Sequence, residues 1–82
     1  MAYRWQSAIR ALMYCIQFDD DPTQAVDHVL QTVVAKSAIG RGGYRDAIAT
    51  ALSSTEPLAA LLSQPHSEEV IRRFLELVLA RL

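Results

Sequence analysis

The segment from Ser67 to Leu82 constrains the fold of this chain more than any other. Five apolar residues in it fall at offsets 0, 3, 4, 7 and 11, along one side of an α-helix. That side is widened by Val70, Leu77 and Leu79 until it covers roughly two-thirds of the circumference. A helix this apolar has to be buried almost completely, in its own domain or against another chain. The five residues are Ile71, Phe74, Leu75, Val78 and Leu82.

The start of this helix is also specified by local chemistry. Ser67 can accept from a free amide of the first turn, and Glu68 and Glu69 stand where the helix dipole favours negative charge. Arg72 and Arg73 each follow one of these acids by four residues. The acid comes first, which is the better orientation for a pair within a helix, so both pairs are expected on the solvated face.

An amphipathic helix is predicted from about Tyr3 to Phe18. Cys15 is expected to be a small core residue of this helix rather than a nucleophile. Trp5 is in register with the apolar stripe and is expected to anchor it in the core. The alternative is that Trp5 and Tyr3 form a contact surface, because both residue types are frequent in interface hot spots. The stripe consists of Trp5, Ile9, Leu12 and Ile16.

A second helix is predicted to begin with Asp21 as its N-cap, Pro22 as its first residue and Gln24 as its third. Its valines would suit a strand, but strict alternation is absent and the cap favours a helix. We expect it to end at Gly40. Its apolar stripe consists of Val26, Val29, Leu30, Val33 and Val34.

The glycines of Gly40–Gly43 predict a flexible joint. A short third helix is expected over Tyr44–Leu52, and Ser53–Pro57 interrupts it because the residue before a proline resists helical angles. A fourth helix of about two turns is expected over Leu58–Leu62. With 82 residues, 51% of them apolar, the chain is expected to be a single helical domain over residues 1–82.

The predicted fold is therefore all-α, a compact irregular bundle of about five short helices with no strand. The helices are short and unequal, which favours irregular packing over a long parallel bundle. The expected core comprises Trp5, Ile9, Leu12, Ile16, Val26, Val29, Leu30, Val33, Ile48, Leu52, Leu58, Leu61, Ile71, Phe74, Leu75 and Val78.

Charge and composition narrow the function classes. The net charge of −1 indicates neither nucleic acid nor an anionic membrane as a partner, and no stretch approaches the roughly 18 apolar residues of a membrane span. One cysteine allows no disulfide within the chain, which suits a reducing compartment, and we expect a cytoplasmic protein. No serine, cysteine or threonine is placed next to a recognisable base and orienting acid, so we expect no enzyme. Cys15, His28 and His66 are too few for a structural zinc site, so no metal or cofactor is expected.

The run Asp19-Asp20-Asp21 is the sharpest charge feature. One interpretation is a solvated turn with an N-cap, and another is a contact for a basic protein. A calcium loop would need glycine at its sixth position and glutamate at its twelfth, where this chain has Gln24 and Leu30. Gly40–Arg45 could likewise be a hinge or a phosphate cradle, but the established phosphate-binding patterns are absent.

Two segments, Gly42–Ser54 and Pro65–Leu75, resemble small all-helical bacterial immunity proteins. These neutralise the toxin domains of contact-dependent growth inhibition and often present an acidic face to a toxin. The resemblance implies a non-catalytic module that binds and neutralises a cognate toxin domain. The expected partner-binding residues are Asp19, Asp20, Asp21, Asp27, Asp46 and Glu56.

Two other functions stay open. One is a small nucleic-acid-binding regulator, in which Arg41 and Arg45 would touch phosphates. The other is a homodimeric helical adaptor, in which the apolar segment Ser67–Leu82 would pack against a second copy. Whether the chain is a monomer or a homodimer is not decided by the sequence.

Overall fold

All regular structure in the computed structural model, which describes residues 4–82, is helical, and the all-α prediction is confirmed. Tyr3, predicted as the start of the first helix and as a contact residue, lies outside the described residues. The elements in chain order are α1 (Trp5–Ile16), η1 (Pro22–Ala25), α2 (Val26–Val29), η2 (Leu30–Val34), α3 (Gly40–Ser53), η3 (Leu58–Leu61) and α4 (Glu68–Ala80).

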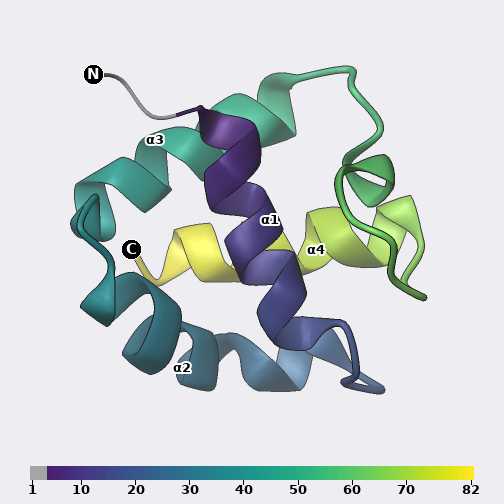
Figure 1. Cartoon of the computed structure of the whole chain (residues 1–82), viewed down its shortest axis with the longest axis horizontal. Helices are drawn as coiled ribbons and strands as arrows, with labels where there is room; N and C mark the ends of the chain where they lie inside the picture. Colours follow the sequence, from purple (N-terminus) through teal and green to yellow (C-terminus); the bar gives the residue numbers. More distant parts are fainter. Residues whose placement is uncertain (1–3) are drawn as a thin grey trace.

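The helices form an irregular bundle rather than a parallel one. In Figure 1, α1 crosses the front of the molecule with α4 behind it, while α3 and α2 lie on either side. Helix α3 packs against both α1 and α4. The extents of 31 × 26 × 20 Å fit this arrangement, because no helix runs alongside another for a long distance. None of the described helices combines the length and the apolarity that crossing a membrane requires.

The core lies where the apolar sides of α1, α3 and α4 meet. Ile9 and Leu12 from α1 and Phe74 and Leu75 from α4 are fully buried, as the periodicity predicts. Four residues that the sequence placed in the core are only half-buried and pack at its margin. They are Trp5, Val33, Leu52 and Leu61. The core instead includes buried residues that the prediction left out, namely Ala8, Met13, Val34, Tyr44, Ala47 and Ala51.

Val34 is buried in the core where Val33 was expected, and the reason is the local geometry of the helix. The helix begun by α2 widens into a π-helical turn over η2, in which the Ala35 amide donates to the Leu30 carbonyl, five residues back. A π turn holds more residues than an α turn, so the buried side moves forward along the sequence. Val34 therefore reaches full burial, and Val33 turns partly outward.

The segment Gly40–Gly43 is not a joint, and this prediction is wrong. It forms the first turn of α3, and the Gly43 amide donates to the Ile39 carbonyl over 3.1 Å. A Cβ at Gly43 would lie 2.7 Å from the Ile39 Cβ, so glycine permits this close approach. Gly40, with φ of 65°, supplies the left-handed residue that turns the chain into the helix. At Gly43 it is therefore the missing side chain of glycine, and not its flexibility, that the fold uses.

The predicted fourth helix is shorter than expected, a single 3₁₀ turn at η3. The amides at the start of η3 have no partner within the turn and donate to a side chain of α4. The carboxylate of Glu68 accepts from Leu58 N at 2.9 Å and from Ala59 N at 2.7 Å. The predicted N-cap of α4 is confirmed, because the Ser67 hydroxyl accepts from Val70 N.

Arg72 binds both Glu68 and the main chain between the end of α3 and η3. Its Nε lies 2.8 Å from Glu68 Oε2, as the sequence predicts, but its other nitrogens donate to main-chain carbonyls. The pair is thus a clamp between α4 and the segment before η3, rather than a solvated surface pair. The expected companion pair, Glu69 with Arg73, forms no ion pair in the described structure. The carbonyls that Arg72 holds belong to Leu52, Ser54 and Glu56.

Candidate functional site

The outer side of α1 exposes the largest apolar groups found on the surface of residues 4–82. Tyr14 is 67% exposed and Phe18 is 90% exposed, and every other large hydrophobic side chain in that range is at least partly buried. Gln17 keeps helical angles after α1 ends, so Phe18 follows Tyr14 by about one turn. Ala11, one turn before Tyr14, is also exposed. We call the side formed by Ala11, Tyr14 and Phe18 the outer α1 face.

The acidic run lies directly after this face. Asp19, Asp20 and Asp21 are all exposed, and the Asp21 carboxylate accepts from Thr23 Oγ1 at 2.6 Å and Thr23 N at 3.1 Å. The Thr23 hydroxyl, followed by its amide, lowers the pKa of Asp21 below its ordinary value. Asp21 is therefore the predicted N-cap, although of the 3₁₀ turn η1 rather than of an α-helix.

Asp19 and Asp20 do not cap a helix in the way that Asp21 does. Within the described residues no hydrogen bond or ion pair engages either carboxylate. Both stand at the C-terminal end of α1, where the helix dipole is negative and further negative charge is unfavourable. These two side chains are thus free to meet a cation from outside.

A shallow hollow of about 410 Å³ opens beside the acidic run. Its lining combines carboxylates with one amide, one imidazole and an apolar patch. No group of residues in the described chain has the make-up to hold a metal ion. It is lined by Asp19, Asp20, Asp21, Gln24, Ala25 and His28.

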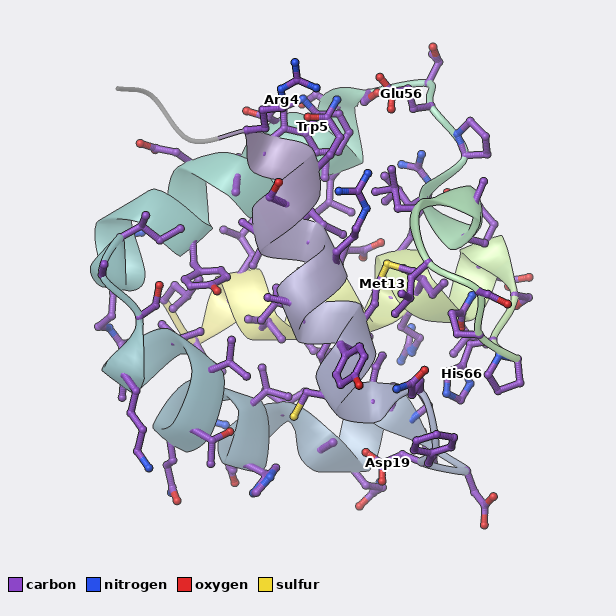
Figure 2. The ribbon with its side chains drawn as sticks, in the orientation of Figure 1. Arg4, Trp5, Met13, Asp19, Glu56 and His66 are labelled. Atoms are coloured by element: carbon purple, nitrogen blue, oxygen red, sulfur yellow. The ribbon has the colours of Figure 1, made fainter. Side chains whose placement is uncertain are left out.

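The remaining predicted acids do not extend this surface. Asp27 on α2 is in an exposed ion pair of 2.5 Å with Arg81. Asp46 and Glu56 both lie near Trp5, each lining a separate hollow with it. Figure 2 shows Glu56 close to Trp5 and Asp19 at the opposite side of the molecule.

Trp5 has a different setting from the one expected of a core anchor. Its ring is half-buried and forms a wall of two shallow hollows on α3, of about 540 and 270 Å³. Thr50 lines both hollows, and Ala49 lines the larger one. Of the six predicted acids, three thus line the hollow after α1, two lie near Trp5, and Asp27 lies apart from both groups in its pair with Arg81.

Tyr14 and Phe18 were missed at the sequence level. A signal existed: both fall outside the stripe of Ile9, Leu12 and Ile16, so a regular helix must point them away from the core. Large aromatic residues on the polar side of an amphipathic helix are candidates for a contact surface.

The basic residues of Gly40–Arg45 are occupied within the fold. Arg41 Nη2 donates to the Arg81 carbonyl at 2.6 Å, and Arg45 Nη2 donates to the Leu82 carbonyl. These bonds join the start of α3 to the end of α4. Both guanidinium groups thus compensate carbonyls at the end of a helix, where cations are favourable.

The soft side chains are scattered. His66 Nε2 lies 3.0 Å from the Ile16 carbonyl at the end of α1, while His28 lines the acidic hollow and Cys15 is half-buried against the core.

No match was found when the chain was compared with protein-family models, with curated proteins and with solved structures.

Proposed function

We propose that this chain is a non-catalytic protein-binding module that docks its partner on the outer α1 face. The observation that carries the proposal is the exposure of Tyr14 and Phe18, 67% and 90%, in a chain whose other large apolar groups in residues 4–82 are at least partly buried. Exposed aromatic residues about one turn apart, here at and just beyond the end of a helix, mark interaction surfaces. The resemblance to small helical immunity proteins suggests the partner: a cognate toxin domain, neutralised in the cytoplasm by covering its working surface.

Both alternatives have less support. A nucleic-acid-binding regulator would use Arg41 and Arg45, whose guanidinium groups already donate to main-chain carbonyls. A homodimer formed through α4 would need an uncovered apolar side, yet Phe74, Leu75 and Val78 are fully buried within the chain itself.

The test is binding and neutralisation of the product of the adjacent gene. Affinity is measured by calorimetry and neutralisation by growth on co-expression. Two matched variants place a bulky cation at an exposed alanine: Ala11→Arg on the outer α1 face, and Ala49→Arg on α3. Arginine is a good helix former, so both variants should keep their stability within about 0.5 kcal/mol.

We expect Ala11→Arg to weaken binding by at least about tenfold, as loss of a contact near the centre of an interface does. Ala49→Arg should bind and neutralise like the parent chain. If the parent chain does not bind the adjacent product, or if both variants neutralise it equally, the proposal is wrong.

A further inference from the structure

The exposed side of α1 has a sequence that complements itself when it is reversed. Its five members recur at offsets 0, 3, 7, 10 and 14, the spacing of a seam between two packed helices, and all five are exposed. They begin with a cation, continue with two small side chains and end with two large aromatic ones. The acidic run Asp19–Asp21 follows directly. The five residues, which we call the α1 seam, are Arg4, Ser7, Ala11, Tyr14 and Phe18.

Both ends of α1 carry the charge that the helix dipole disfavours. Arg4 precedes the first helical residue, where the dipole is positive, and Asp19 and Asp20 follow the last turn, where it is negative. Figure 2 shows Arg4 and Asp19 at opposite ends of the helix. Within residues 4–82 no hydrogen bond or ion pair engages the Arg4 guanidinium or these two carboxylates. Opposite charges from another molecule would offset the cost at both ends.

A second copy laid antiparallel along the α1 seam, which no described element covers in Figure 1, supplies these charges at both ends. The cation of each copy then lies beside the acidic run of the other. Ser7 lies opposite Phe18 of the other copy, and each small side chain of the seam faces a large one, as close packing of two helices requires. Ala11 lies opposite Tyr14 in the same way. A parallel arrangement would instead place like charges together at both ends and ring against ring.

We infer that the chain, when free of its partner, forms a twofold dimer in which two copies of α1 lie antiparallel along their seams. The contact is isologous, because each copy gives the same residues to it. The inference rests on the proposed function only in sharing its face: the seam includes the outer α1 face, so the second copy must leave before the partner docks. One helix per copy buries less surface than a permanent dimer needs, and the dimer is therefore weak and reversible.

Sedimentation equilibrium of the chain alone tests the dimer. At low ionic strength the average mass should rise from that of a monomer at about 5 µM toward twice that value at about 500 µM, as expected for a small interface. Amide NMR shifts that depend on protein concentration should be confined to α1 and the acidic run. Added salt should weaken the association, because the charges at both ends are exposed.

Charge reversal tests the antiparallel direction. Arg4→Glu alone, or Asp19→Lys with Asp20→Lys, sets like charges together at both ends and should raise the dissociation constant at least about fivefold. The three changes in one chain exchange the two ends and should return the dissociation constant to within about twofold of the parent value. A parallel pair would not be rescued, because it would still place like charge on like. The helix dipole favours every changed charge, so these variants should stay folded.

Two alanine variants separate the seam from the rest of the surface. Ala11→Arg places a long cation in the middle of the seam and should leave a monomer. Ala49→Arg places the same side chain at an exposed position of α3 and should dimerise like the parent chain.

Several results would overturn the inference. These are a parent chain that stays monomeric up to about 500 µM, an Ala11→Arg variant that still dimerises, NMR shifts centred outside α1 and the acidic run, or a triple charge variant as weak as the partial reversals. If the adjacent product is neutralised while the chain alone stays monomeric, only this inference fails. If the dimer behaves as expected but the adjacent product is not bound, only the proposed function fails.

Discussion

Glu68 and Arg72 lie one turn apart on α4, and each holds a different end of the segment that leads from α3 to η3. The Glu68 carboxylate accepts from the amides that open η3, while the Arg72 guanidinium donates to the Leu52 carbonyl in the last turn of α3 and to the Ser54 carbonyl just after it. Their mutual bond of 2.8 Å keeps both side chains in place. The start of α4 therefore organises a stretch of chain that has little helical structure of its own.

Removing the Glu68 carboxylate should destabilise the fold. Glu68→Ala loses two amide partners and an ion pair, and we expect a loss of about 1–2 kcal/mol, because the carboxylate is partly exposed and its pairing is screened. Glu69→Ala is the control: it sits in the same helical turn but is exposed, so its effect should stay within about 0.5 kcal/mol. Urea unfolding measures both, and equal losses would contradict the role given to Glu68.

The same carboxylate should give stability a pH dependence. Burial raises the pKa of Glu68, but the Ala59 and Leu58 amides and then Arg72 outweigh it and lower the pKa below its ordinary value of 4.5. A lowered pKa means that the stabilisation is complete above the ordinary value and is lost as the pH falls below it. The stability difference between the parent chain and Glu68→Gln should therefore shrink in acid. A difference that stays constant from neutral pH to pH values well below 4.5 would count against this.

The start of α3 offers a test of two neighbouring glycines. A Cβ at Gly42 would meet no atom within 4 Å, so Gly42→Ala should stabilise the chain by about 0.5–1 kcal/mol through helix propensity. A Cβ at Gly43 would lie 2.7 Å from the Ile39 Cβ, so Gly43→Ala should destabilise it by about 1–2 kcal/mol. Thermal unfolding should move the two midpoints in opposite directions. Two shifts of the same sign would show that the first turn is not packed as described.

The π turn can be tested through two adjacent valines. Val34 is fully buried and Val33 only partly, so Val34→Ala should cost about 1.5–2.5 kcal/mol and Val33→Ala less than about 1 kcal/mol. A regular α-helix would give the reverse order. Chemical denaturation of both variants decides between the two registers.

The parts of the fold that were predictable depend on local chemistry. The stripes of α1 and α4 and the caps at Asp21 and Ser67 involve residues within a few positions of each other, so the sequence specifies them directly. The first turn of α3 was not predictable in this way. Its glycines are there because Ile39 approaches closely, a contact that propensity alone does not reveal.

The candidate site was predictable only in part. The acidic run was recognised, but the separation of Asp46 and Glu56 from that run depends on how α1 crosses α3, which is a tertiary property. Phe18 was placed only as the end of a helix, and its exposure depends on no other element covering the outer α1 face. Arg72 likewise has one predictable partner, one turn away, and several distant ones that only the folded chain brings near.

The widened turn at Leu30–Val34 also bears on how this chain should be compared with others. A π turn accommodates one residue more than the helix around it needs, as if a single amino acid had been inserted without breaking the helix. A relative lacking that residue would match this chain on either side of the turn but in different registers. Its alignment would need a one-position gap inside a helix, where gaps are normally penalised most.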